Sequence, residues 1–278
     1  MSSVPEIQIA DGVAIPQLGF GVYQVPPETT RETVTTALEV GYRHIDTAQM
    51  YANEQGVGDA VRTSGLNRGE VFITSKLNNS FHRRDDALRE AEKSVERLGG
   101  PMDLFLIHWP LPTIDVDYLE TWKAMIEIRD AGLTRAIGVS NFQVPHLQRI
   151  IAETGVTPAV NQIEVHPYLT NEAVRSYGAT QGIATEAWSP IAQGAVLDDP
   201  VITAIAERLG KTTAQVTLRW HILRGDIVFP KSVTRSRVEE NFQIFDFDLT
   251  DADIRDISAL NRDHRTGPDP DTFDYVPV

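Results

Sequence analysis

Residues 71–108, VFITSKLNNSFHRRDDALREAEKSVERLGGPMDLFLIH, contain two apolar runs separated by a charged segment. The runs VFITSK (71–76) and MDLFLIH (102–108) are short and rich in branched and aromatic residues, as strands buried on both faces are. The segment RRDDALREAEKSVERLG (83–99) has helical spacing and ends at a glycine, a common residue just past a helix C-terminus. The stretch therefore predicts a strand–helix–strand unit of a parallel sheet.

The same alternation continues along the whole chain. PETTRETVTTALEVG (27–41) and YLETWKAMIEIRDAG (118–132) are two further helical segments that end at glycine. Candidate strands end roughly 25 to 30 residues apart, with one longer gap before the last, as expected for repeated β–α units. There are eight of them, at 17–21, 43–46, 71–76, 102–108, 135–140, 159–163, 184–188 and 226–231. Eight such units in about 250 residues predict an α/β fold, a (β/α)8 TIM barrel.

A doubly wound sheet is the alternative fold, and it would carry a glycine-rich phosphate turn after its first strand. Here Gly19 and Gly21 give G-x-G without the third glycine. Ahead of them, EIQIADGVAIPQLG (6–19) alternates apolar residues around an Asp-Gly pair, a strong signal for a two-residue hairpin. We therefore expect an N-terminal β-hairpin that closes the bottom of the barrel, an irregular tail from about Arg262, and one domain over residues 1–278.

Composition restricts the classes of function. The chain has 278 residues and a formal net charge of −14, from 25 Lys and Arg against 39 Asp and Glu. This balance disfavours a surface for nucleic acid or anionic lipid, although a local basic cluster could hold a small anion. The absence of cysteine excludes disulfides, thiolate metal sites and a cysteine nucleophile. Without a signal-like N-terminus, a membrane-length apolar run or a heptad pattern, we expect a cytoplasmic monomer with no obligate protein partner.

Polar residues recur where the candidate strands end, which in a (β/α)8 barrel is the functional face. They are Asp46 with Tyr51 in the loop beyond it, Lys76, His108, Ser140 with Asn141, Gln162, Trp188 and Lys231. Each has an ordinary structural alternative when taken alone. His108 would more often be a packed histidine, Lys76 a solvated strand end, and Asn141 a helix N-cap. Their convergence on one rim favours a functional site.

Four of these residues suggest proton transfer to a carbonyl oxygen. The Lys76 ammonium would be costly in the barrel mouth without a counter-ion, and Asp46 is one strand away. A cation beside Tyr51 would stabilise its phenolate, which makes a phenol of ordinary pKa about 10 a usable acid. A neutral His108 could orient the carbonyl. We assign His44, two residues before Asp46, to packing.

No side chain supplies a hydride, so a reductase would need a cofactor. FPKSVTRSRVEEN (229–241) concentrates Lys231, Ser232, Arg235 and Arg237 at the start of a helix. It is either a solvated helix N-terminus or an anion site, and a basic pair there would favour a phosphorylated ribose. Trp188 could stack on a nicotinamide whose carboxamide binds Ser140, Asn141 and Gln162. The alternatives are a core aromatic, an N-cap and a buried amide.

At these residues the chain resembles the aldo-keto reductase superfamily over essentially its whole length. The matching stretches are GYRHIDTAQMYANEQGVG (41–58), MDLFLIHWP (102–110), GLTRAIGVSNF (132–142), PAVNQIEVHP (158–167) and VFPKSV (228–233). The resemblance implies NADPH-dependent reduction of aldehydes or ketones by a tetrad of Asp46, Tyr51, Lys76 and His108, with Tyr51 as the general acid. It implies that NADP(H) is bound by Ser140, Asn141, Gln162, Trp188, Lys231, Ser232, Val233, Arg237, Glu240 and Asn241.

Within the superfamily, Trp188 and the short C-terminus are most similar to the prokaryotic 2,5-diketo-D-gluconate reductase-like group. That similarity implies small keto-sugar or α-dicarbonyl substrates. The resemblance places Tyr23, Asn78 and Trp109 at substrate-pocket positions, but Asn78 stands where many relatives carry tryptophan, and Tyr23 where some do. The pocket's specificity therefore does not transfer.

Two other classes of function stay open at this point. A cofactor-binding sensor with little turnover would keep the fold, although the complete tetrad argues against it. A metal-dependent hydrolase would use His44, Asp46 and His108, but the sequence clusters no further ligands near them. We predict no resident metal.

Overall fold

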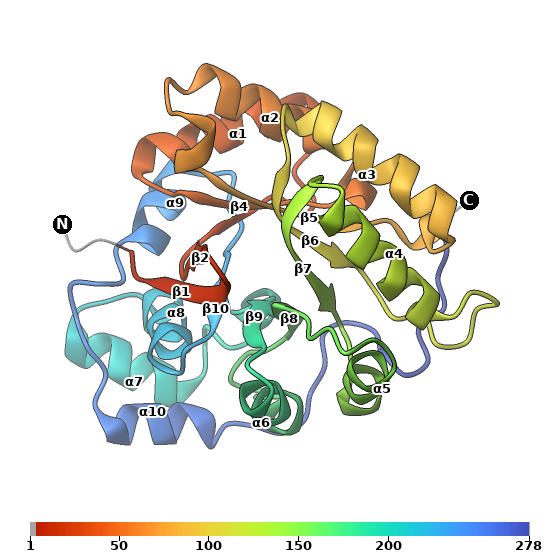
Figure 1. Cartoon of the computed structure of the whole chain (residues 1–278). Coiled ribbons are helices and arrows are strands. Elements are labelled where there is room, and N and C mark those ends of the chain that lie inside the picture. The colour runs from red at the N-terminus through yellow and green to blue at the C-terminus, as the bar shows by residue number, and fades with distance from the viewer. Residues whose placement is uncertain (1–3, 278) are drawn as a thin grey trace.

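The computed structural model describes residues 4–277, so residues 1–3 and 278 of the predicted domain lie outside the described part. Eight parallel strands form one sheet in the order β10-β9-β8-β7-β6-β5-β4-β3, inside a ring of helices (Figure 1). A parallel bridge between Leu18 and Val228 joins the two edges, supported by backbone hydrogen bonds from Gly19 N to Val228 O and from Val228 N to Gln17 O. The predicted (β/α)8 barrel is confirmed.

The strands of the barrel are β3 (Phe20–Gly21), β4 (His44–Asp46), β5 (Phe72–Leu77), β6 (Met102–Ile107), β7 (Thr134–Ser140), β8 (Val160–Glu164), β9 (Ala184–Trp188) and β10 (Ile227–Val228). The helices are α1 (Pro27–Val40), α2 (Glu54–Thr63), α3 (Arg84–Leu98), α4 (Tyr118–Asp130), α5 (Val144–Thr154), α6 (Glu172–Thr180), α7 (Pro200–Leu209), α8 (Thr213–Leu223), α9 (Arg235–Phe242) and α10 (Asp251–Ser258). Four short 3-10 turns complete the elements: η1 (Gln49–Tyr51), η2 (Arg68–Glu70), η3 (Asn79–Phe81) and η4 (Ala192–Gly194).

The eighth strand is shorter than the sequence predicted. We expected it over 226–231, but β10 ends at Val228. Pro230 has no N–H to give to a neighbouring strand, which is one reason the ladder stops early. Lys231 therefore lies in the loop beyond the strand and not at its end.

The predicted N-terminal hairpin is present and closes the barrel bottom. β1 (Glu6–Ala10) and β2 (Val13–Pro16) pair antiparallel around the Asp11-Gly12 turn, and Figure 1 shows them across one end of the ring of strands. Gly12 has a φ of 69°, which glycine adopts without strain. The hairpin residues Ile9, Val13 and Ile15 are buried in one apolar cluster with Leu104, Leu106, Ala136, Val160 and Ile227.

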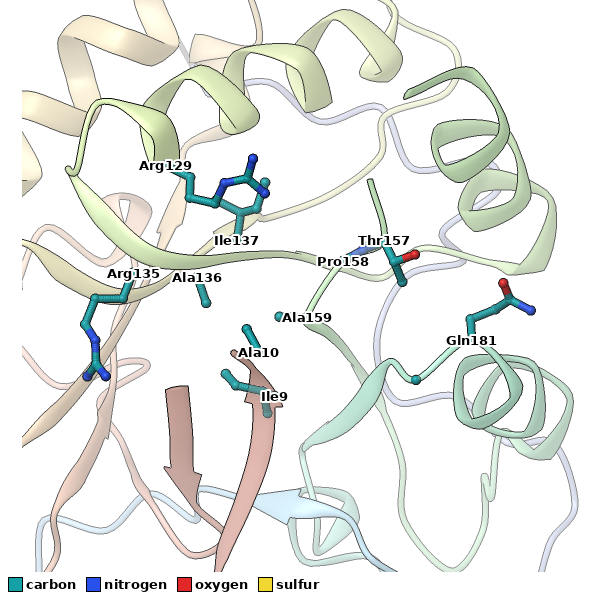
Figure 2. A pocket seen from close by; sticks show the side chains of 11 residues that line it. Ile9, Ala10, Arg129, Arg135, Ala136, Ile137, Thr157, Pro158, Ala159 and Gln181 are labelled. Atoms are coloured by element: carbon teal, nitrogen blue, oxygen red, sulfur yellow. The ribbon is translucent and has the colours of Figure 1, made fainter. Parts of the chain in front are cut away.

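The hairpin end also carries a surface recess of about 250 Å³ (Figure 2). It is bordered by the tip of β1, by Arg135 at the start of β7, by Pro158 before β8 and by Gln181 after α6. These segments lie at the amino ends of the strands. The recess is therefore at the opposite end of the barrel from the polar strand ends.

Candidate active site

The carboxyl ends of β4 and β5 bring Asp46 and Lys76 together. Lys76 Nζ donates to Asp46 Oδ1 at 2.7 Å and to the Thr47 carbonyl at 2.9 Å. The two side chains are only 0% and 2% exposed, so the solvated alternative for Lys76 is wrong. Burial lowers the pKa of Lys76, but the negative charge and hydrogen bond of Asp46 outweigh this effect, so the pKa is raised overall and the ammonium stays charged. Burial raises the pKa of Asp46, against the opposing effect of the Lys76 charge.

Tyr51 ends η1 and faces this ion pair. Lys76 Nζ lies 5.2 Å from the centroid of the Tyr51 ring, and the His108 ring lies 5.7 Å from it. Burial raises the pKa of Tyr51 to about 12, and the Lys76 charge acts to lower it. Lys76 thus acts in the expected direction, but burial outweighs it. Tyr51 holds its proton at neutral pH.

His108 follows β6 and is buried as a neutral group. Burial and the Lys76 charge hold its pKa well below the ordinary value, so the imidazole is uncharged. Its Nδ1 is buried and has no hydrogen-bond partner among residues 4–277. His108 is therefore not a packed histidine with both ring nitrogens hydrogen-bonded.

The ends of β7 and β9 form a polar wall beside this group. Asn141 Nδ2 donates to the His108 carbonyl at 3.0 Å, and Asn141 Oδ1 accepts from Trp188 Nε1 at 2.8 Å. Ser140 Oγ donates to the Gln162 carbonyl at 2.8 Å. The helix that follows begins after Gln143, so Asn141 is not an N-cap. Its φ of 66° instead turns the chain so that its amide links His108 to Trp188.

Gln162 of β8 links Asp46 to a second carboxyl group, that of Glu186, which was not predicted from the sequence. Its Nε2 donates to Asp46 Oδ2 and to Glu186 Oε2, each at 2.8 Å. Glu186 lies in the middle of β9 and is fully buried. Burial, with the nearby Asp46 charge, raises its pKa to about 8. A carboxyl in the ATEAW run, at the same strand parity as Trp188, was the available signal.

His44 lies below Asp46 and packs, as predicted. It is fully buried, its Nδ1 is 3.3 Å from the Pro16 carbonyl, and its Nε2 is 3.2 Å from Thr74 Oγ1. With both nitrogens engaged, it is a poor metal ligand. Within residues 4–277, no group of three or more His, Asp or Glu side chains is arranged to hold a metal ion.

The loop after β10 and the first turn of α9 carry two cations, Lys231 and Arg237, that form no ion pair with any other residue of 4–277. Arg235, in contrast, binds Glu39 and Glu239. Of the other residues predicted here, Ser232 accepts from Thr234 N, Glu240 accepts from Thr212 Oγ1, Val233 is 61% exposed, and Asn241 is half-buried on α9. The loop and the start of α9 thus present positive charge and apolar surface together.

The predicted pocket residues surround the same mouth. Tyr23 is 58% exposed, and its ring lies 5.1 Å from that of Tyr51. Asn78 is the N-cap of η3, and its side chain accepts from Ser80 N at 3.0 Å. The Trp109 ring packs 4.3 Å from Phe273 in the tail.

The irregular tail is confirmed, and it is fixed by contacts that the sequence does not predict. Glu164 of β8 accepts hydrogen bonds from Thr266 N and Gly267 N. A side chain at Gly267 would overlap the Trp188 ring. Farther along, the Tyr275 carbonyl accepts from Asn79 Nδ2 at 2.9 Å. In Figure 1 the blue tail runs from α10 past α5 to the region of α3.

Comparison with known proteins agrees with this geometry. The sequence profile of the Aldo/keto reductase family matches residues 17–262. An aldo-keto reductase of Mycolicibacterium smegmatis is 51% identical over 273 residues, which cover 98% of this chain and 99% of that protein. The methylglyoxal reductase DkgA of Escherichia coli K12 is 48% identical over 276 residues, with coverage of 98% and 99%. The chain belongs to the aldo/keto reductase family and is an aldo-keto reductase.

A solved structure supports the same assignment. A mutant of Gox0644, crystallised in complex with NADPH, is 43% identical and superposes with a TM-score of 0.94 over 99% of this chain and all of that one. No helix formed by the described residues combines the length and apolar character that a membrane crossing requires.

Proposed function

We propose that the chain is a single catalytic domain that reduces aldehydes and ketones to alcohols with NADPH. One observation carries the proposal. At the carboxyl end of the barrel, protonated Tyr51 lies against the charged Lys76 and the neutral His108. Together they offer a carbonyl oxygen a proton donor, a positive field and an N–H donor.

Each of the four residues has a distinct proposed role. Tyr51 donates its proton to the carbonyl oxygen. The Lys76 charge stabilises the phenolate that remains, and Asp46 holds Lys76 in place through the 2.7 Å contact. A neutral imidazole has one N–H, and His108 uses it to orient the substrate oxygen toward Tyr51.

The residues present fit NADP(H). Unpaired Lys231 and Arg237 are suited to the 2′-phosphate, with Ser232, Val233, Glu240 and Asn241 around the adenosine. Trp188 is held by its hydrogen bond to Asn141 and can support the nicotinamide ring, while Ser140, Asn141 and Gln162 retain oxygen lone pairs for its carboxamide. When bound, NADPH supplies the hydride that no side chain can give. The solved NADPH complex of the relative supports this assignment.

The substrates we propose are small carbonyl compounds, including α-dicarbonyls and keto sugars. The name of the Escherichia coli relative, methylglyoxal reductase, supports this class. Trp109, Tyr23 and Asn78 would line the pocket. No nucleic acid, membrane or protein partner enters the proposed reaction.

The test is Tyr51→Phe. This substitution keeps the ring but removes the only proposed acid, so we expect at least a hundredfold loss of turnover, the usual scale for a general acid. NADPH binding, followed by its fluorescence, should stay nearly unchanged. Turnover is followed by NADPH absorbance with a panel of aldehydes and α-dicarbonyls.

Tyr177→Phe on α6 is the matched control, because it makes the same chemical change away from the site and should leave turnover intact. Full turnover by Tyr51→Phe would contradict the mechanism. NADPH binding without turnover of any substrate by the unmodified protein would favour a sensor instead.

A further inference from the structure

Glu186 lies beneath the proposed catalytic residues, and its role is not explained by packing. Its carboxyl is fully buried, and its Oε2 shares the Gln162 amide with Asp46. Its other oxygen, Oε1, is buried without a hydrogen-bond partner among residues 4–277. A buried carboxylate oxygen with no hydrogen-bond donor costs free energy if the carboxyl is ionised. The protonation state of Glu186 therefore needs an explanation.

Asp46 and Glu186 accept different numbers of hydrogen bonds. Asp46 accepts from Lys76 Nζ on Oδ1 and from Gln162 Nε2 on Oδ2. Within the described part of the chain, Glu186 accepts only from Gln162, on Oε2. Negative charge is therefore far better stabilised on Asp46 than on Glu186.

The hydrogen-bond pattern of His44 adds a second constraint. The Pro16 carbonyl near its Nδ1 can only accept, so Nδ1 carries the imidazole hydrogen. Burial lowers the pKa of His44 to about 3, so its Nε2 is a bare acceptor. That Nε2 lies 3.8 Å from Glu186 Oε1. Because Nε2 carries no hydrogen and contacts Thr74 Oγ1 at 3.2 Å, His44 offers no donor to Oε1, and a charge on Oε1 would stay uncompensated unless Glu186 carried a proton.

We propose that Glu186 is a positioning residue that keeps a proton on Oε1 in the working enzyme, so that Asp46 alone bears the negative charge of the site floor. This inference rests on the proposed function of the tetrad. A pKa raised to about 8 is consistent with it. The charged and titratable groups that face Glu186 are Asp46 and His44 from β4 and Lys76 from β5, while β8 and β10 contribute neutral Gln162 and apolar Ile227.

The proton matters because it sets the net charge below Tyr51. With Glu186 neutral, Lys76 and Asp46 sum to zero. When Glu186 loses its proton to solvent, the floor carries one net negative charge. That charge opposes the Lys76 field which stabilises the Tyr51 phenolate, so proton donation becomes harder.

Infrared spectroscopy of the full-length protein tests the proton directly. The carbonyl stretch of a protonated carboxyl is separate from carboxylate bands. At neutral pH we expect this band in the unmodified protein, a shift of the band after labelling with ¹³C-glutamate, and its loss as pH rises through about 8. Glu186→Gln should abolish it.

Glu164→Gln is the matched control, since Glu164 is a buried glutamate on the adjacent strand whose pKa is lowered by its hydrogen bonds despite the opposing effect of burial. This variant should keep the band. Absence of the band from the unmodified protein, or its survival in Glu186→Gln, would overturn the proposal. If Glu186→Gln does not fold, the ¹³C shift and the pH titration of the unmodified protein decide.

Kinetics tests the consequence separately. In the unmodified enzyme, kcat/KM for carbonyl reduction should fall on the order of tenfold above the Glu186 transition, as expected for a shift of about one pKa unit at Tyr51. Glu186→Gln should lack that break, and an identical break in both proteins would refute the coupling. If the unmodified protein reduced no carbonyl compound, the proposed function would fail while the infrared result still decided the proton on Glu186.

Discussion

Replacing Lys76 by methionine separates the charge of this residue from its packing. Methionine fills most of the space of the lysine stem, but it removes the ammonium that donates to Asp46 Oδ1 and to the Thr47 carbonyl. Among residues 4–277, Asp46 then keeps only the Gln162 amide as a side-chain donor. The variant should lose carbonyl reduction, and it should also lose stability in a way that depends on pH.

The size of the loss follows from the burial of the pair. The Asp46 side chain is 2% exposed, so its carboxylate cannot be solvated where it stands. Removing one partner of a buried ion pair costs about 3–5 kcal/mol. A second route gives the same scale, because protonating a carboxyl of ordinary pKa near 3.9 at pH 7 costs about 4 kcal/mol. We therefore expect a free energy of unfolding about 3–5 kcal/mol lower at neutral pH.

The stability of Lys76→Met should fall as pH rises, because buried Asp46 then has to hold a proton in the folded state. Burial raises the folded-state pKa of Asp46, and without Lys76 its charge no longer opposes this rise. Between the unfolded and folded pKa values, the folded variant binds one proton more than the unfolded chain. Below the pKa of Asp46 in the unfolded chain, the variant keeps its stability relative to the unmodified protein. Between that pKa and the higher folded-state pKa, it loses about 1.4 kcal/mol for each pH unit. Titrations common to both proteins cancel in this difference.

The assay is urea unfolding followed by tryptophan fluorescence, for both proteins at several values between roughly pH 5 and pH 8. The double variant Lys76→Met/Asp46→Asn is the control, since it removes both charges and should recover most of the stability but none of the turnover. A stability difference that does not change with pH would show that Asp46 is already neutral beside Lys76. A double variant as unstable as the single one would show that packing, and not charge, is lost.

Two further predictions address the cofactor loop and the barrel bottom. Arg237→Ala should raise the Kd for NADPH at least tenfold more than that for NADH, measured by fluorescence titration, and equal losses would remove Arg237 from the 2′-phosphate site. Gly19→Ala would drive a Cβ into the His44 ring and should cost about 1–3 kcal/mol in urea unfolding. Gly69→Ala has open space around it and is the matched control, so equal effects of the two substitutions would contradict the steric argument.

The fold was predictable because its signals are local. Apolar runs and glycine-ended helices located the eight units, and the Asp11-Gly12 turn located the hairpin. Two strands were predicted too long, because 17–21 is reduced to Phe20–Gly21 and 226–231 to Ile227–Val228. The second contains Pro230, whose effect on the ladder is itself local. Lys76 and Asp46 could be paired in advance because consecutive strands of such a barrel are neighbours, and an unpaired buried lysine would be too costly.

Glu186 and the tail were not predictable for a different reason. The contact between Glu186 and Asp46 passes through Gln162 and depends on the register of strands far apart in sequence. The tail has no periodic pattern, and its position depends on single hydrogen bonds such as those of Glu164. Register and isolated polar contacts are set by the assembled barrel, so the pattern of one segment does not reveal them.

The raised pKa of Tyr51 does not conflict with its proposed role as an acid. A phenol of pKa about 12 keeps its proton at any physiological pH, so the donor is always loaded. In the proposed reaction the proton would go to the substrate oxygen, which gains alkoxide character as the carbonyl is reduced, and an aliphatic alkoxide is a stronger base than a phenolate. Transfer from Tyr51 is therefore downhill even after burial has raised its pKa. The Lys76 charge limits the rise in the Tyr51 pKa. A second negative charge below Tyr51, such as that of ionised Glu186, would oppose this effect of Lys76.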